Sequence, residues 1–551
     1  MKDKKDFRVL IVYPNLPLML VPGIAIGILT RLFKDQGYVL DFFETTHYDT
    51  EETNLSEVKI NYSENRVKLL NARKFSITDD LGIRIKSNML DDFQKKVIDF
   101  QPDFMAFSVV EDTFHQAISM LSIIADLNIK HLIGGVFPTM APDVCISHKQ
   151  IQMIGLGEGE DSIIKVSEAV RKNMSLEGIP GTWFKKENGE IIKTEQPPLT
   201  NINNVIPDFS LFDESRFMRP MGGRIFKMMP VESYRGCPYA CTYCNSPAQR
   251  AFTKKNELGT FLRRKTIQNL RDELAHYVNS HDPEFILFVD DSFLARPIQE
   301  TLEFCDMYEE FKIPFWINTR SENCKSEILP RLKDVNCYRM AFGIESGNEQ
   351  YRRKILRRNV SNADLIRNFK LIADSGISFS INLIIGMPGE TRELVMDTVE
   401  LARSLKGFDT ITSFIFTPYH GTVLREVSVQ NGWLDPNIIT MHNTSRSLLK
   451  MPSPYLNADE IDGLLSVLPL YVYFPKNEWK NIRRAEKNDD EGIRLREYYS
   501  EIYAKNFLKE YQDSEKIFLP DVPGDLRDYS ISPDRIIPEQ LEQLIGPAAG
   551  I

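Results

Sequence analysis

Short apolar runs alternate with helical patterns through the first third of the chain. Residues 8–13 form an apolar run typical of a buried parallel strand, and from Gly23 to Asp35 the apolar residues recur at helical spacing. Strands that alternate with helices predict a doubly wound, Rossmann-like parallel sheet in an α/β protein. The same patterns predict further strands at residues 39–43, 103–109, 131–133 and 152–154, and helices at 113–127 and 161–171.

A second series of apolar strands begins near the middle of the chain. Each strand is followed by a helical or loop-helical stretch, so this series predicts a partial (β/α)6 barrel of the TIM type. The active site of such a barrel is expected at the carboxyl ends of its strands. The six strands are predicted at residues 231–234, 285–289, 315–318, 338–342, 379–385 and 411–417.

These patterns divide the chain into four parts. The expected boundaries are a Rossmann-like domain at 1–172, a linker at 173–225, the partial barrel at 226–430 and a mainly helical domain at 431–551. The linker contains Trp183 in a short predicted hairpin. Residues 50–90 are polar and irregular, and we interpret them as an insertion with a small hairpin.

Length, charge and hydropathy narrow the class of protein. The 551 residues exceed what one core can hold, and the net charge of −10 argues against non-specific nucleic-acid binding. No apolar run reaches the roughly 18 residues of a membrane span. The N-terminus leads into one short strand rather than a signal-peptide core. We therefore expect a cytoplasmic protein, in a reducing compartment that suits free thiols.

Three cysteines at C-x3-C-x2-C spacing lie in one short loop: Cys237, Cys241 and Cys244. Thiolates bind iron–sulfur clusters, zinc and copper(I). Because no fourth cysteine follows until Cys305, a four-iron cluster held here keeps one iron open for an outside ligand. Structural zinc needs a fourth ligand that the neighbouring sequence lacks. The odd total of seven cysteines disfavours a set of disulfides.

The cysteine spacing, with Tyr243 before the third cysteine, resembles the signature of radical S-adenosylmethionine (SAM) enzymes. That resemblance implies a [4Fe-4S] cluster whose open iron chelates SAM. SAM needs acceptors for its ammonium, donors for its carboxylate and a wall for its adenine. The resemblance and the predicted strand ends together indicate these SAM contacts: Tyr243, Asp290, Asp291, Arg320 (with Arg358 as the alternative), Glu345, Ser346 and Gly386.

Two glycine turns end strands of the N-terminal domain, where a doubly wound sheet binds its ligands. Pattern alone leaves a nucleotide, a flavin, a corrinoid or no ligand open. The wider pattern over about residues 7–170 resembles the cobalamin-binding domain of cobalamin-dependent radical SAM enzymes. It departs from that family at Phe137, where histidine is frequent, and it lacks the motif that supplies an axial histidine to cobalt in other cobalamin proteins. The resemblance therefore implies cobalamin bound without a protein histidine, and these contacts: Gly134, Gly135, Pro138, Thr139, Gly157, Glu158 and Gly159.

The combined resemblance covers about residues 7–430 and implies a reaction. The cluster reduces SAM, the resulting 5′-deoxyadenosyl radical abstracts hydrogen from an unactivated carbon, and methylcobalamin supplies a methyl group. The substrate is expected to be a small or lipid-like molecule, and the electron donor a flavodoxin or ferredoxin. Tyr419 and His420 follow the sixth predicted strand and are candidates for a catalytic acid or base. A radical SAM cyclase and a corrinoid carrier or sensor are the alternatives.

Overall fold

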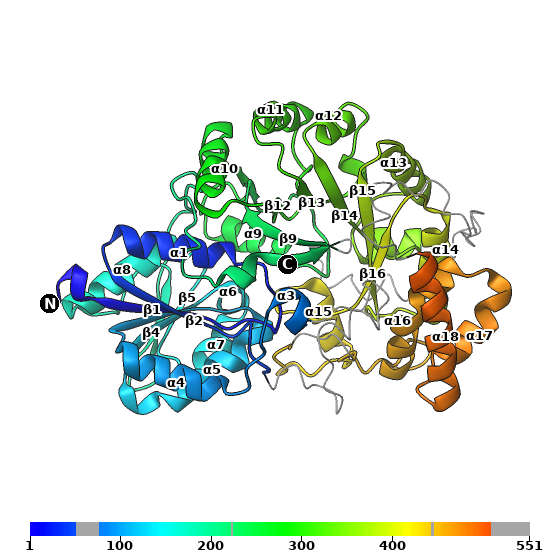
Figure 1. Cartoon of the computed structure of the whole chain (residues 1–551). Helices are drawn as coiled ribbons and strands as arrows, with labels where there is room; N and C mark the ends of the chain where they lie inside the picture. The colour runs from blue at the N-terminus through cyan, green and yellow to red at the C-terminus, as the bar shows by residue number, and fades with distance from the viewer. Residues whose placement is uncertain (51–76, 222–223, 442–445, 508–551) are drawn as a thin grey trace.

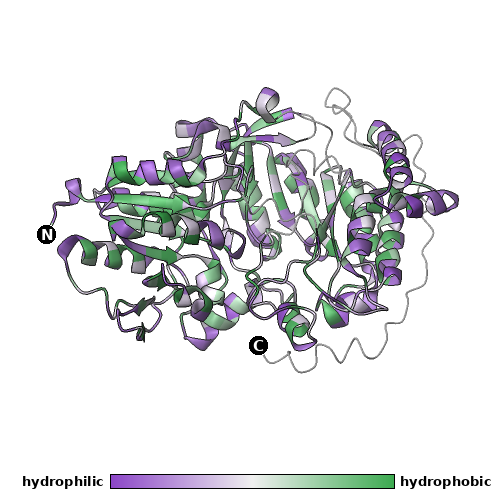
Figure 2. Cartoon of the chain, turned by 90° about the horizontal axis from the view of Figure 1, so that it is seen from below, coloured by the Kyte–Doolittle hydropathy of each residue, from purple (hydrophilic) through white to green (hydrophobic). Residues whose placement is uncertain are grey.

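The computed structural model describes residues 1–50, 77–221, 224–441 and 446–507, so most of the predicted insertion lies outside the described residues. Two seven-stranded sheets dominate the fold (Figure 1). Apolar residues concentrate on the strands of both sheets, and hydrophilic residues on the outward-facing parts of the helices (Figure 2). One cluster of buried residues runs from one face of the first sheet into the second sheet.

The first sheet is doubly wound, as the sequence predicts. Its strand order is β2-β1-β3-β4-β5-β6-β7, and the first five strands are parallel. Alternate residues of β1 enter opposite cores, because successive side chains of a strand point to opposite faces: Val9 packs with the α1 side and Leu10 with the α4 side. The strands are β1 Arg8–Tyr13, β2 Val39–Glu44, β3 Phe104–Ser108, β4 Lys130–Gly134, β5 Met153–Gly155, β6 Thr182–Lys185 and β7 Ile191–Lys193.

Helices cover both faces of this sheet (Figure 1). One face carries α1 (Ile24–Asp35) and α8 (Glu160–Lys172), and the other carries α4 (Met89–Phe100), α5 (Phe114–Ile123) and α7 (Pro142–Ser147). The short helix α6 (Val136–Met140) follows β4 directly. The predicted hairpin around Trp183 is β6 and β7, which extend the sheet as antiparallel strands.

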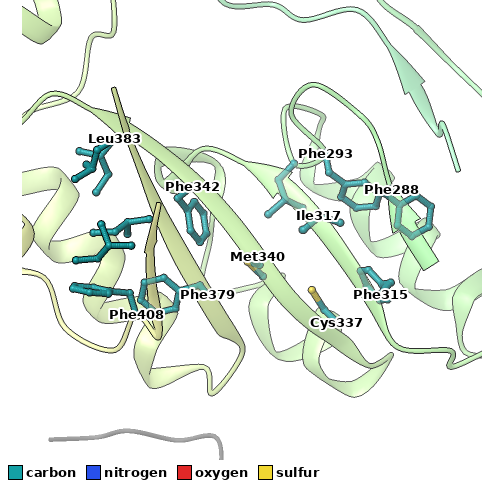
Figure 3. Packing of buried hydrophobic residues seen from close by; sticks show 14 of the residues in the cluster. Phe288, Phe293, Phe315, Ile317, Cys337, Met340, Phe342, Phe379, Leu383 and Phe408 are labelled. Atoms are coloured by element: carbon teal, nitrogen blue, oxygen red, sulfur yellow. The ribbon is translucent and has the colours of Figure 1, made fainter. Parts of the chain in front are cut away.

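The second sheet is the predicted partial barrel. Six parallel strands follow the order β16-β15-β14-β13-β12-β9, with β8 antiparallel at the edge. Buried aromatic and aliphatic side chains fill the space between these strands and the outer helices (Figure 3). The strands are β8 Met218–Met221, β9 Arg224–Val231, β12 Phe285–Phe288, β13 Phe315–Thr319, β14 Cys337–Glu345, β15 Ser378–Ile385 and β16 Thr410–Ile415. The outer helices are α10 Ile267–His281, α11 Ile298–Tyr308, α12 Leu329–Asp334, α13 Asn362–Asp374 and α14 Arg392–Ser404.

The prediction of the first barrel strand was wrong in position. The strand ends at Val231, where the prediction began it, because β9 forms a hairpin with β8 and enters the sheet seven residues earlier, at Arg224. The predicted segment ends at Tyr234, the first residue of β10 (Tyr234–Arg235), which pairs with β11 (Arg263–Arg264) in a separate two-stranded ribbon.

Helices form the described C-terminal region, as predicted. They are α16 Ala458–Tyr473, α17 Trp479–Ala485 and α18 Asp490–Asn506, and α15 (Val423–Gln430) precedes them at the end of the predicted barrel segment. Helix α16 contacts both α14 and β16, so it covers the last strand of the partial barrel. Its Asn457 cap and Glu460 form a capping box. Within the described residues, no helix has the length and apolarity of a membrane span.

Candidate functional site

The three cysteines lie in a loop between β10 and helix α9 (Ser246–Lys255). Gly236 opens the loop with a φ of +97°, and a Cβ there would meet the Phe261 carbonyl oxygen at 2.8 Å. Thr242 anchors the loop, since its hydroxyl donates to the Ile355 carbonyl at 2.7 Å and its own carbonyl accepts from the N–H of Leu424 at 3.0 Å. The loop is thus fastened to the segments that follow β14 and β16.

The three thiols interact electrostatically. Burial raises the pKa of Cys237, and the charges of Asp291 and Cys241 raise it further. Cys244 interacts with both other cysteines. Among the described residues, no group of three or more His, Cys, Asp or Glu side chains is placed so that it could hold a single metal ion. A four-iron cluster has a different requirement, because each cysteine binds a different iron. Three cysteine thiolates fit three irons of such a cluster and leave the fourth iron open.

Asp290 and Asp291 differ in their surroundings. Asp290 is buried and accepts hydrogen bonds from the backbone N–H groups of Ser233 and Tyr234 at 2.7 and 3.1 Å, and from Arg296 at 2.8 Å. Both of its carboxylate oxygens are therefore engaged within the protein. Asp291 is exposed beside the cysteine loop. Of this predicted pair, Asp291 is the carboxylate better placed for a ligand.

Arg320 lies directly against the cysteine loop. Its guanidinium is 3.8 Å from the centre of the Tyr239 ring, and Tyr239 belongs to that loop. Arg320 is 7% exposed, and its Nη2 has no hydrogen-bond partner within the described part of the chain. Its Nε lies 3.0 Å from Oε1 of Glu322, so the guanidinium is already paired with one carboxylate, and Nη2 is the donor left to fit the carboxylate of a bound amino-acid group. This contact supports the predicted role of Arg320 toward SAM.

Tyr243 and Glu345 meet at the end of β14. The Tyr243 hydroxyl donates to Glu345 Oε1 at 3.1 Å, and Arg358 Nη1 is 3.1 Å from that hydroxyl and 3.3 Å from the carboxylate. Glu345 has a left-handed backbone, with a φ of +65°. The hydroxyl of Ser346 and the Nε of Arg358 are buried without partners among the described residues. Arg358 contacts Tyr243 of the cysteine loop, so its unpaired Nε fits a polar ligand there, and Ser346 follows Glu345 directly at the same strand end.

Gly386 begins the loop after β15. Its N–H donates to Oε2 of the buried Glu390 at 2.6 Å, and the Met387 N–H donates to the same oxygen at 3.3 Å. Helix α14 begins two residues later, at Arg392, and the Glu390 carboxyl turns back into the loop. Burial raises the pKa of Glu390 to about 8, despite these two hydrogen bonds. Glu390 therefore fixes the backbone at Gly386.

The two glycine turns of the N-terminal domain lie side by side. Thr139 joins them, since its hydroxyl donates to the Gly135 carbonyl at 2.8 Å and accepts from the Gly157 N–H at 2.9 Å. Pro138 is buried within α6, and the space around the Cα of Gly159 is open. Adjacent strand ends of this kind are where doubly wound sheets bind ligands. The arrangement fits a corrinoid held by backbone rather than by a histidine.

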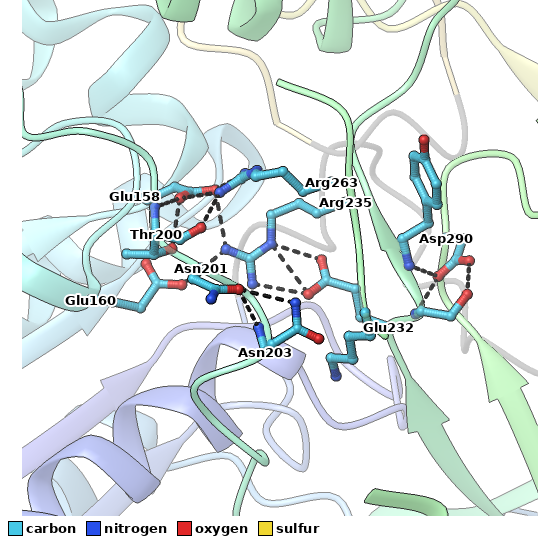
Figure 4. Close-up of polar contacts among 12 residues, drawn as sticks. Glu158, Glu160, Thr200, Asn201, Asn203, Glu232, Arg235, Arg263 and Asp290 are labelled. Carbon is cyan, nitrogen blue, oxygen red and sulfur yellow. Dashed lines mark hydrogen bonds and ion pairs between the residues drawn. The ribbon is translucent and has the colours of Figure 1, made fainter. Parts of the chain in front are cut away.

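Glu158 is engaged with the partial barrel. Its carboxylate accepts from Thr200, Arg235 and Arg263 (Figure 4). Burial by itself raises the pKa of Glu158, but the hydrogen bond from Arg263 and the two arginine charges lower it to about 2. The side chain that the resemblance assigns to cobalamin thus forms a contact between domains. Sequence reasoning did not identify either arginine.

Tyr419 and His420 contact the N-terminal domain. The Tyr419 hydroxyl donates to Asp112 at 2.9 Å, and Nδ1 of His420 lies 2.7 Å from Glu111. His420 also packs edge-on against Phe137, with ring centres 5.4 Å apart. Burial raises the pKa of Asp112 to about 7. The acid–base roles stay a prediction, but these contacts favour a role in holding the domains together. The signal that sequence reasoning passed over was an acidic pair just beyond a buried strand.

Three of the remaining cysteines lie in one core. Cys305, Cys324 and Cys337 are buried in the hydrophobic cluster of the partial barrel. Burial raises the pKa of Cys337 well above the usual value, and Cys305 and Cys324 raise it further. These thiols come from three separate segments of the sequence, and the fold brings them near one another. Their surroundings are those of core thiols.

The chain is similar to known proteins both in sequence and in fold. Residues 231–402 match the radical SAM superfamily, so this segment, which contains the cysteine loop, is a radical SAM domain. The fold is similar to that of the radical S-adenosylmethionine methyltransferase TsrM from Kitasatospora setae, solved with cobalamin and a [4Fe-4S] cluster bound. The TM-score is 0.54 at 15% identity, over 86% of each chain.

Two relatives resemble the chain in sequence. An uncharacterized methyltransferase of Pyrococcus horikoshii is 26% identical over 384 residues, which cover 65% of this chain and 79% of that protein. The anaerobic magnesium-protoporphyrin IX monomethyl ester cyclase of Rubrivivax gelatinosus is 23% identical over 357 residues, which cover 62% of this chain and 61% of that protein. One relative is thus named for methyl transfer and the other for ring closure.

Proposed function

We propose that the protein is a cobalamin-dependent radical SAM enzyme that methylates an unactivated carbon of a small or lipid-like substrate. The observation that carries the proposal is the joining of two sites. A three-cysteine loop in a radical SAM domain is attached through Glu158 and Arg235 to the glycine turns of a doubly wound domain. Methylation of an unactivated carbon requires that a hydrogen be removed and a methyl group supplied at one place.

Each cofactor would have its own set of binding residues. Cys237, Cys241 and Cys244 would hold the cluster. Arg320 would bind the SAM carboxylate, Asp291 its ammonium, and the backbone at Gly386 its adenine. Glu345 and Ser346 would supply further polar contacts, while Asp290 positions the strand end. Gly134, Gly135, Pro138, Thr139, Gly157 and Gly159 would surround the corrinoid. When bound, these groups supply one-electron cleavage of SAM and a carrier for a methyl group.

The test is anaerobic purification with cobalamin supplied, followed by iron, sulfide and corrinoid analysis. We expect about four irons per chain, as a [4Fe-4S] cluster requires, together with one corrinoid. Replacement of Cys241 by alanine is expected to remove most of the iron, because two thiolates cannot hold a four-iron cluster. Replacement of Cys305, a buried core thiol, by alanine is the matched control and should leave the iron content unchanged.

The outcomes separate the candidate functions. Iron without corrinoid would reject the cobalamin part of the proposal. Corrinoid without iron would favour a carrier or sensor, which has no need of the radical SAM domain. If both are present, SAM labelled in its methyl group distinguishes methylation from cyclisation, because only a methyltransferase moves the label into a product. The second candidate, a cyclase, is favoured by the relative from Rubrivivax gelatinosus.

A further inference from the structure

Glu158 joins three segments of the chain. It accepts from Thr200 at 2.8 Å (backbone) and 2.7 Å (hydroxyl), from Arg235 at 3.1 Å and from Arg263 at 2.9 Å, and Arg263 makes a second contact with the other carboxylate oxygen. Thr200 precedes the barrel, and both arginines lie on the β10–β11 ribbon. Figure 4 shows the carboxylate and the two guanidinium groups together. A two-pronged pair of this kind fixes orientation as well as distance.

Arg235 connects Glu158 to the cysteine loop. It also donates to Glu160 at 2.9 Å and to Glu232 at 2.9 Å, and it is two residues before Cys237. The charged side chains of this group are between 15 and 19% exposed, so bulk water screens them little. We call Glu158, Glu160, Glu232, Arg235 and Arg263 the clasp. It ties the second glycine turn to the start of the cysteine loop.

A separate contact secures the first glycine turn. Helix α6 follows that turn, and its Met140 lies against Gly421, where an added Cβ would come within 2.8 Å of the methionine sulfur. The clasp lies by the first parallel strand of the partial barrel, β9, and this second contact follows the sixth, β16. The N-terminal domain is therefore held at both ends of the parallel series.

We propose that Arg263 and Glu158 are positioning residues that set the distance between the group bound at the glycine turns and the group bound at the cysteine loop. This role rests on the proposed function. Replacing a whole buried ion pair by packed apolar residues often costs no stability, so the contribution of this pair is to select one arrangement, although loss of one partner alone is destabilising. A displacement of about 1 Å between reacting groups is enough to slow a transfer by roughly 100-fold.

The main variant is Arg263→Gln, which removes the pair with Glu158. The matched control is Arg171→Gln, because Arg171 also donates twice to one glutamate, Glu168, and once to a backbone carbonyl, but entirely within the N-terminal domain. Glu158→Gln is the second variant should the first not fold. Each protein is purified anaerobically with its cluster, saturated with hydroxocobalamin and supplied with SAM and titanium(III) citrate.

Two products of SAM report on two geometries. Release of S-adenosylhomocysteine would follow transfer of a methyl cation from SAM to the reduced corrinoid, whose electron pair would form the new bond. This product therefore requires both domains. Release of 5′-deoxyadenosine with methionine follows one-electron cleavage by the cluster and uptake of a hydrogen atom from the medium, so it requires the barrel alone. We expect Arg263→Gln to slow release of S-adenosylhomocysteine at least tenfold and to leave release of 5′-deoxyadenosine within twofold of wild type. Arg171→Gln should leave both rates within twofold of wild type.

Hydrogen exchange of the apoprotein adds a readout that needs no cofactor. Residues 157–160 and 235–237 should exchange faster in Arg263→Gln and not in Arg171→Gln. Equal loss of both products, or unchanged release of S-adenosylhomocysteine, would overturn the positioning role. The same selective loss in Arg171→Gln would also overturn it. Wild-type protein that releases no S-adenosylhomocysteine would instead reject the proposed function itself, and the positioning role with it.

Discussion

Replacement of Gly135 by alanine is expected to destabilise the protein by about 4 kcal/mol or more and to lower the midpoint of thermal unfolding by roughly 10 °C. Gly135 has a φ of +121° and a ψ of −171°, a backbone region that residues with a Cβ avoid. The added Cβ would lie 2.2 Å from the carbonyl oxygen of Val109 on the neighbouring strand end. Because that contact is with backbone, the two strand ends must separate.

Gly134 provides the matched control for this prediction. A Cβ there would have the Phe107 carbonyl oxygen, at 3.9 Å, as its nearest neighbour, so Gly134→Ala should change stability by less than about 1 kcal/mol. If the corrinoid lies against this backbone, the new methyl group should weaken binding of hydroxocobalamin at least tenfold, measured by titration of the apoprotein. Unchanged affinity in a stable Gly134→Ala variant would place the corrinoid elsewhere.

Local signals in the sequence were enough to predict the sheets. Apolar runs bounded by turn residues identified five of the six parallel barrel strands, because a strand buried on both faces is apolar throughout. A serine just before a helical pattern is a local cap signal, and Ser361 caps α13, since its hydroxyl accepts from the Asp364 N–H at 3.0 Å. The misplaced first strand shows the limit of this reasoning. Residues 224–231 mix charged and apolar residues, because β9 is only partly buried in its first half, where it pairs with the edge strand β8.

The partners of polar side chains were beyond the reach of sequence reasoning. Glu158 and Arg263 are 105 residues apart, and nothing local to either residue indicates the other. The motif around Glu158 predicted a ligand loop, yet the carboxylate binds the other domain. The same holds for Asp112 and Tyr419, which are 307 residues apart. Strand-end position predicted which side chains lie near the site, and only the fold decides which of them remain free for a ligand.

Replacement of Glu390 by glutamine is expected to stabilise the protein relative to wild type above pH 8 and to lose that advantage below about pH 4.5. The pKa of Glu390 is raised from 4.5 to about 8, because the carboxyl is fully buried. One oxygen accepts two backbone N–H groups, and the other has no partner among the described residues. The neutral acid is therefore the form that the fold prefers, and glutamine reproduces its shape without a charge.

The direction of the pH dependence follows from proton linkage. Because the folded protein holds the Glu390 proton more tightly than the unfolded chain, its contribution to stability is complete below pH 4.5 and is lost as the pH rises through about 8. Between those values the stability of wild type should fall against Glu390→Gln by about 1.4 kcal/mol per pH unit, on the order of 5 kcal/mol in total. Denaturant unfolding of the apoprotein at half-unit pH steps measures this difference.

Glu168→Gln is the control with the opposite sign. Hydrogen bonds from Arg171 hold the pKa of Glu168 below its usual range. The contribution of Glu168 to stability is therefore complete above the pKa that it has in the unfolded chain, and it is lost as the pH falls below that value. Between pH 5 and pH 8 the difference between wild type and Glu168→Gln should therefore be flat. A flat difference for Glu390→Gln over the same range would mean that Glu390 is ionised in the folded protein. The loop at Gly386 would then present a negative charge toward the SAM site, and the neutral wall proposed for adenine would have to be abandoned.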